Sequence, residues 1–97
     1  MMAFYVYILA NKPKGTLYVG YTDVLGRRLH EHREKVRAGF TQKYALDRLV
    51  YFEPLETREQ AKQRERRLKH WLRAWKIDLI EQHNPQWRDL SDDIPHF

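Results

Sequence analysis

The sequence contains no cysteine. Disulfide frameworks and cysteine-ligated zinc or iron–sulfur sites are therefore excluded, and the absence fits a reducing compartment, so we expect a cytoplasmic protein. Serine occurs once, as Ser91 in an acidic tail, which argues against a Ser/His/Asp triad. No glycine-rich phosphate loop of either common pattern is present, so we expect no nucleotide cofactor.

Long apolar segments are missing as well. No stretch approaches the length needed to cross a bilayer, and the first residues lack the apolar core of a signal peptide, so we expect no membrane partner. The five histidines show no His-Glu-x-x-His spacing, which argues against a zinc hydrolase.

Size and charge narrow the class further. A chain of 97 residues is expected to form a single domain, residues 1–97, because two domains would each be too small to bury a core. Lys and Arg total 18 against 13 Asp and Glu, which gives a net charge of +5. This excess indicates a polyanionic partner, and nucleic acid is the first choice.

The first half of the sequence predicts a hairpin followed by a helix. Residues 4–10 form an apolar run typical of a strand covered on both faces, residues 11–15 carry turn chemistry, and residues 16–21 return as a second strand. If Ala10 pairs with Gly15, Tyr7 falls opposite Tyr18 and both phenols share one face, whereas a one-residue slip separates them. Thr22 or Asp23 caps the helix that follows.

The second half adds one strand and two helical segments. A basic loop is expected around residues 39–43, and a short strand over residues 49–52 that Pro54 closes. A capping box of Thr57 and Gln60 opens a long helix to about residue 71 or beyond, with a further helical segment over 74–82. Asn84-Pro85 ends that segment, and the tail folds back through Trp87 and Leu90. The ββαβαα order predicts an α/β fold: a small three-stranded, mostly antiparallel sheet flanked by helices.

The first helix carries a candidate phosphate-binding pair. Leu25, Leu29 and Val36 recur on one face, and Arg28 and His32 stand one turn apart at the edge of that face. A rigid guanidinium at a core edge can grip phosphate oxygens with two parallel hydrogen bonds. The alternative is that Arg28 covers apolar surface with its stem and His32 caps the core.

The long helix carries a carboxylate where an apolar residue is expected. Its apolar stripe is defined by Ala61, Leu68, Leu72 and Trp75, and Glu65 falls inside that stripe. A buried carboxylate must be hydrogen-bonded, paired or bound to a metal. A metal site, a salt bridge to Arg28 and partial exposure at the helix edge stay open. Because Trp75 lies on the stripe, core packing is favoured over stacking on bases.

Two tyrosine motifs precede the basic helix, namely Tyr5-Val6-Tyr7 and Tyr18-Val19-Gly20. With these motifs at this separation, the chain resembles the GIY-YIG nuclease superfamily, in particular its small stand-alone bacterial branch. The first motif departs from the family form, with Tyr5 in place of glycine and Val6 in place of isoleucine. The second motif is close to it.

The resemblance implies roles for individual residues. Arg28 lies where the family has its catalytic arginine, ten residues after Tyr18, and His32 lies four residues further on. Glu65 matches the metal-binding glutamate, and Asn84 is the best match to an asparagine that helps hold the site, although its place before Pro85 explains it without function. Exposed cations are candidates for phosphate contacts: Arg27, Lys62, Arg66 and Lys69.

The implied reaction is hydrolysis of a phosphodiester by in-line attack of water. Glu65 would hold Mg²⁺ or Mn²⁺, Tyr7 or Tyr18 would orient or deprotonate the water, Arg28 would neutralise phosphoryl charge, and His32 would serve as auxiliary base or phosphate donor. We expect DNA as the substrate, with weak sequence preference for single-stranded, branched or damaged forms and a role in repair or recombination, while RNA stays open. A non-catalytic nucleic-acid-binding module and a basic protein-interaction domain are the competing interpretations.

Overall fold

The computed structural model describes residues 3–33 and 46–94, with the side chains of residues 31–33 left out. Within these residues, three strands and three helices follow in the predicted order. They are β1 (Phe4–Ala10), β2 (Leu17–Thr22), α1 (Leu25–Arg33), β3 (Arg48–Leu55), α3 (Arg58–His70) and α4 (Arg73–His83), with a 3₁₀ turn at Ser91–Asp93. The expected α/β fold with a small antiparallel sheet is therefore confirmed. Val36 and the loop at residues 39–43 lie outside the described residues.

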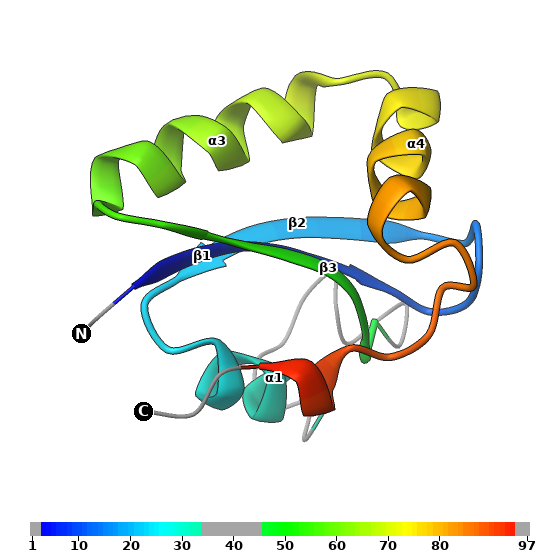
Figure 1. The fold of residues 1–97 in the computed structure, drawn as a ribbon, viewed down its shortest axis with the longest axis horizontal. Helices are drawn as coiled ribbons and strands as arrows, with labels where there is room; N and C mark the ends of the chain where they lie inside the picture. Colours follow the sequence, from blue (N-terminus) through cyan, green and yellow to red (C-terminus); the bar gives the residue numbers. More distant parts are fainter. Residues whose placement is uncertain (1–2, 34–45, 95–97) are drawn as a thin grey trace.

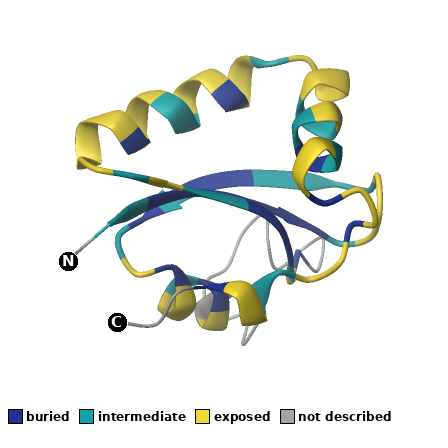
Figure 2. Ribbon diagram, in the orientation of Figure 1, coloured by how far each residue is buried: buried dark blue, intermediate teal, exposed yellow. Residues whose placement is uncertain are grey.

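The sheet has the order β2-β1-β3, and both pairings are antiparallel. α3 and α4 lie over one face, and α1 lies over the other together with the 3₁₀ turn (Figure 1). Central β1 is buried along almost its whole length (Figure 2), as its unbroken apolar run predicted. β2 is left as an edge strand of this sheet.

The hairpin register differs from the predicted one by two residues. Ala10 pairs with Leu17, not Gly15, and Tyr7 pairs with Gly20. The turn takes the extra residues: the Asn11 side chain accepts a hydrogen bond from the Thr16 amide at 3.0 Å, so Thr16 belongs to the turn. Because side chains alternate with a period of two, an even shift leaves every residue on its predicted face.

β3 is longer than predicted and continues through Pro54, which lies opposite Tyr5. Proline lacks the N–H that a second neighbour would require, but β3 is an edge strand of the described sheet and needs none on its outer side. Proline therefore does not close the strand, and the prediction that it does was wrong.

The apolar stripe proposed for the long helix holds only for its first part. Ala61 and Leu68 are fully buried, but the helix ends at His70, and Trp71 caps it in an extended conformation. Leu72 is 62% exposed and Trp75, now on α4, is 53% exposed. The prediction that Trp75 packs in the core is wrong, because a helical wheel cannot be continued across a break in the helix.

The start of α3 follows the sequence signal. The Thr57 hydroxyl accepts a hydrogen bond from the Gln60 backbone amide at 3.1 Å, and the Gln60 side chain accepts one from the Thr57 backbone amide at 3.3 Å, which confirms the capping box.

Within the described residues, no helix has both the length and the apolar character to cross a membrane.

The C-terminal segment packs back onto the sheet, as predicted. Trp87 is 2% exposed and belongs to the core on the α3 and α4 face. The Leu90 amide donates to the Leu49 carbonyl at 2.8 Å, and the Arg48 guanidinium donates to the Trp87 carbonyl at 2.9 Å. These contacts tie residues 87–90 to β3.

Candidate functional site

Tyr7 and Tyr18 lie on the sheet face that α1 covers. Their ring centroids are 6.3 Å apart with planes inclined at 42°. Tyr7 is buried, whereas Tyr18 is partly exposed, so the second phenol is the more accessible of the two. The prediction that both phenols share one face is confirmed.

The Tyr7 ring passes over Gly20 toward the open edge of the sheet. A Cβ at Gly20 would stand 2.6 Å from the Tyr7 hydroxyl oxygen and 3.1 Å from the Tyr18 ring. The Tyr7 phenol therefore lies across edge strand β2 at a position that only glycine leaves open. In the sequence Gly20 stands out only as part of the second tyrosine motif, although a glycine inside a strand is itself a signal of a close approach.

Helix α1 brings Arg28 beside this face. Leu25 and Leu29 are almost fully buried and pack in the same cluster as Tyr7, as the helical wheel predicted. Arg28 lies next to Leu29 and is partly exposed, while Arg27 is exposed. The backbone of His32 belongs to α1, but its side chain lies outside the described part of the structure, so its predicted role stays a prediction.

Glu65 lies on α3, over the opposite face of the sheet. Its side chain is 19% exposed, and its Oε1 is 3.3 Å from the ammonium of Lys69 one turn along the helix. The carboxylate is thus partly exposed at a helix flank and paired locally. Lys69, predicted to contact nucleic acid, has this carboxylate as a neighbour.

The contacts of the neighbouring residue show which flank Glu65 occupies. Arg64 donates from its Nε to Glu53 of β3 at 2.9 Å, so that flank of α3 faces β3. On a helical wheel Arg64 and Glu65 are about 100° apart, on either side of the buried line through Ala61 and Leu68. Glu65 therefore occupies the flank away from β3, and α3 packs mainly on β1 and β2.

The polar contacts on the β3 flank fix the rotation of α3. Tyr51 donates its hydroxyl proton to Glu53 at 2.9 Å, and the Arg64 guanidinium lies 5.3 Å from the centre of the Trp71 ring. Burial, together with the hydrogen bond to Glu53 and its negative charge, raises the pKa of Tyr51 to about 12. Tyr51 therefore stays a neutral donor at physiological pH.

Contacts at the two ends of α3 show which residue of β2 lies nearest to the position of Glu65 along the strand. Arg58 pairs with Asp23, just after β2, at 3.7 Å, and Arg73, just after α3, donates to the Gly15 carbonyl before β2 at 2.7 Å. α3 therefore runs antiparallel to β2. Glu65 lies ~10 Å along the helix from Arg58, at 1.5 Å per residue. The same distance back along β2 from Asp23 leads to Gly20, at ~3.3 Å per residue.

Glu65 and Gly20 are thus expected at the same height beside the β2 edge. The two phenols reach this edge from one face of the sheet, and the carboxylate lies over the other. With no strand beyond β2 in the described sheet, this edge is open to a substrate from both faces. Tyr7, Tyr18 and Arg28 thus lie on the α1 side of the sheet and Glu65 on the α3 side.

A divalent cation would have one protein carboxylate in this site. Among the described residues no group of three or more His, Cys, Asp or Glu is arranged to hold a metal. Mg²⁺ commonly takes only one or two carboxylates and completes its shell with water and substrate phosphate. An exposed ion pair between residues i and i+4 contributes only ~0.3–0.5 kcal/mol to stability, so a metal ion can replace Lys69 beside the Glu65 carboxylate. Glu65 fits a metal site that the substrate completes.

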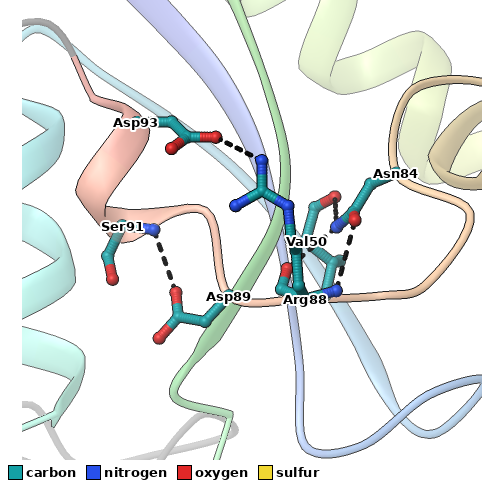
Figure 3. A network of polar contacts seen from close by, with 6 residues as sticks. All are labelled: Val50, Asn84, Arg88, Asp89, Ser91 and Asp93. Atoms are coloured by element: carbon teal, nitrogen blue, oxygen red, sulfur yellow. Dashed lines mark hydrogen bonds and ion pairs between the residues drawn. The ribbon is translucent and has the colours of Figure 1, made fainter.

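Asn84, the remaining candidate, makes structural contacts (Figure 3). Its amide donates to the carbonyls of Val50 at 3.1 Å and Arg88 at 2.9 Å, and its Oδ1 accepts from the Arg88 amide at 3.2 Å. Both amide protons are used on the β3 side of the sheet, away from the β2 edge. These contacts favour the structural explanation, and we leave Asn84 out of the proposed catalytic group.

Asn84→Ala is expected to lower the free energy of unfolding by about 2–4 kcal/mol. The side chain is 3% exposed, and its removal leaves buried backbone groups without partners, at ~1–3 kcal/mol each. Urea unfolding checks the value. Asp93→Asn, which breaks the exposed 2.8 Å pair with Arg88, is the control and should cost less than ~1 kcal/mol. Equal effects of the two changes would contradict the structural role.

The remaining predicted cations face solvent. Lys62 and Arg66 are exposed on α3, as Arg27 is on α1. These positions agree with the predicted solvent faces and leave the side chains accessible to a phosphate backbone.

Comparison with known proteins decides the family. A family model described as the GIY-YIG catalytic domain matches residues 3–78. The chain belongs to the GIY-YIG family. Membership places it in a nuclease superfamily, as the tyrosine motifs and Glu65 indicated.

The relatives of this GIY-YIG protein are small proteins of similar length. A UPF0213 protein of Clostridium perfringens is 38% identical over 76 residues, covering 78% of this chain and 81% of the relative. One of Haloquadratum walsbyi is 37% identical, covering 80% and 86%. The solution NMR structure of a UPF0213 protein from Bacillus halodurans aligns with a TM-score of 0.57 at 32% identity, covering 91% of this chain and 93% of that one.

Proposed function

We propose that this GIY-YIG protein is a metal-dependent endonuclease that hydrolyses phosphodiester bonds in DNA with weak sequence preference. The observation that carries the proposal is the close approach at Gly20, which brings the Tyr7 phenol across the edge strand at the height expected for Glu65. A phenol pair, a cation and a carboxylate around one open strand edge form a suitable group for phosphoryl chemistry.

Each residue has a separate task in this mechanism. Glu65 would hold Mg²⁺ or Mn²⁺, which supplies Lewis-acid stabilisation of phosphoryl charge when it is bound. Tyr18, the more exposed of the two, accepts the proton of the attacking water on its phenolate oxygen, after its own hydroxyl proton has passed to solvent, and Tyr7 orients that water from its buried position. Arg28 donates hydrogen bonds to the non-bridging oxygens as their charge grows. His32 assists as a phosphate donor or second base.

The substrate follows from what the fold offers. No described element is a recognition helix or finger placed to read bases, so recognition rests on the phosphate backbone and on nucleic-acid structure. We propose single-stranded, branched or damaged DNA, with a role in repair or recombination in the cytoplasm, and Arg27, Lys62 and Arg66 as backbone contacts.

Incubation with labelled single-stranded, duplex and flap DNA tests this function. We expect cleavage with Mg²⁺ or Mn²⁺ and none with EDTA, at rates that depend on the form of the DNA more than on its sequence. The same oligonucleotides as RNA serve as the comparison substrate. A protein that binds these substrates but cuts none of them with either metal is a binding module, and the proposal then fails.

A further inference from the structure

A cavity of about 580 Å³ lies at the end of the β1–β2 hairpin, beside the start of α4. We call it the turn pocket. It is lined by Asn11, Lys12, Gly15, Thr16, Leu17, Arg73 and Lys76. Its lining comes from two segments about sixty residues apart in the sequence, so the tertiary fold creates it.

The lining of the turn pocket is cationic. Lys12, Arg73 and Lys76 contribute three positive charges, and no carboxylate is among the residues that line it in the described structure. Burial, reinforced by the charge of Arg73, lowers the pKa of Lys76. Like charges held together without a counter-charge are unfavourable, and a bound anion would relieve them.

The fold holds these cations in place. The Nη2 group of Arg73 donates to the Gly15 carbonyl at 2.7 Å and also to the Lys14 carbonyl, so the guanidinium is fixed against the turn and keeps further N–H groups. The Lys76 ammonium lies 3.4 Å from the Lys69 carbonyl at the end of α3. A preorganised group of donors loses little side-chain entropy when it binds an anion.

The turn pocket opens at the start of β2, the same strand whose edge carries the candidate catalytic group. Leu17 lines the pocket, and Gly20 lies ~10 Å further along the strand at ~3.3 Å per residue. A nucleic-acid strand that follows the β2 edge therefore passes both places within a few nucleotides. A volume of about 580 Å³ has room for a phosphate and part of its sugar.

We propose that the turn pocket binds a backbone phosphate of the nucleic-acid strand, a few nucleotides from the phosphate that is cut at the β2 edge. The proposal rests on the proposed function for the position of the cut, but the binding itself needs neither a metal nor turnover. Lys12 and Lys76 attract the phosphate, and the Arg73 guanidinium contacts its oxygens from its fixed position.

Binding of a fluorescent single-stranded 12-mer in EDTA, at several salt concentrations, tests the pocket without cleavage. Lys76→Gln is expected to lower affinity ~5-fold at 0.1 M salt and to reduce the slope of log K against log salt by ~0.7, the amount for one lost phosphate contact on a single strand. Lys12→Gln, at an exposed turn position, should act in the same direction and covers the case in which Lys76→Gln does not fold.

Arg88→Gln is the matched control, because it removes the same charge from an exposed side chain near β3. It should leave the affinity within ~2-fold of wild type. Lys12→Gln and Lys76→Gln variants that both behave like Arg88→Gln would overturn the turn pocket, even if the wild type cuts DNA. A wild type that never cuts, but whose binding depends on these lysines, would overturn the nuclease proposal and leave the pocket standing.

Two further measurements locate the phosphate. Titration of the 12-mer into labelled protein should shift the amide NMR signals of residues 11–17 and 73–76, and an absence of shifts there contradicts the proposal. Oligonucleotides ending in a 5′-hydroxyl and a 5′-phosphate should bind equally, because an internal phosphate fills the pocket. A preference for the 5′-phosphate would overturn the internal assignment in favour of a terminal group.

Discussion

Glu65→Gln is expected to abolish metal-dependent cleavage while leaving DNA binding intact or slightly stronger. The substitution keeps the shape of the side chain and removes the one carboxylate that α3 presents toward the β2 edge. A bound cation supplies several kcal/mol of transition-state stabilisation, so the rate should fall at least ~100-fold. Single-turnover cleavage with Mg²⁺, together with binding measured in EDTA, separates the two effects.

Glu59→Gln provides the matched control. Glu59 lies in the first turn of the same helix and is exposed, and its replacement by Gln changes the net charge by the same one unit. Its loss should leave the cleavage rate within ~2-fold of wild type. If Glu65→Gln cut as fast as Glu59→Gln, the metal site would lie elsewhere even with the nuclease function intact. If both variants lost activity equally, the effect would belong to charge in general and not to the place of Glu65.

The ion pair between Glu65 and Lys69 allows a second measurement, of stability. In the wild type the Lys69 ammonium lies 3.3 Å from the Glu65 carboxylate, where it competes with a cation. Removing the pair costs little stability, because the lysine side chain is 50% exposed. Glu65→Gln should therefore unfold in urea at nearly the wild-type midpoint, so that a lost activity cannot be explained by a lost fold.

The faces of the sheet could be predicted from the sequence, although the exact pairing could not. The register of Tyr7 depended on how many residues the turn consumes, and the Asn11 side chain bonded to the Thr16 amide lengthened it. The register differed from the predicted one by two residues, an even number, so the side-chain period of two kept Tyr7 and Tyr18 on one face. Local periodicity is therefore a sound guide to faces even where turn length is uncertain.

Breaks between elements were harder to predict. Leu72 and Trp75 continue the helical spacing of Ala61 and Leu68, and nothing as strong as a proline or glycine marks the end of α3. The exposure of Trp75 follows from that break, which tertiary contacts such as those of Arg73 with the hairpin turn stabilise. Propensity along the chain does not include such contacts.

The place of Glu65 relative to the tyrosines was also beyond the sequence. A helical wheel placed it inside the buried stripe, and the 19% exposure of its side chain matches the alternative of partial exposure at the helix edge. Which sheet edge it faces depends on the Arg64–Glu53 contact, and residues 53 and 64 belong to different elements. The turn pocket is a second example, because Lys12 and Arg73 have no local pattern in common.

Arg28→Ala is expected to lower the cleavage rate by ~10²–10⁵, the range found when a transition-state cation or oxyanion donor is removed. Arg28 is partly exposed beside buried Leu29 on α1, the helix that covers the sheet face carrying both phenols. Because phosphoryl charge grows only as the bond breaks, the loss should fall on kcat and leave KM nearly unchanged.

Two variants separate this role from simple attraction. Arg27→Ala removes the same charge from the exposed neighbour and should mainly raise KM, with a salt slope reduced by about one. Arg28→Lys keeps the charge but loses the planar fork, and it should recover only a small part of the rate because lysine cannot contact two oxygens in parallel. Full activity in Arg28→Lys would reduce the role of Arg28 to a point charge. Equal effects of Arg27→Ala and Arg28→Ala on kcat and KM would remove Arg28 from the catalytic group, since a backbone contact alone stabilises substrate and transition state alike.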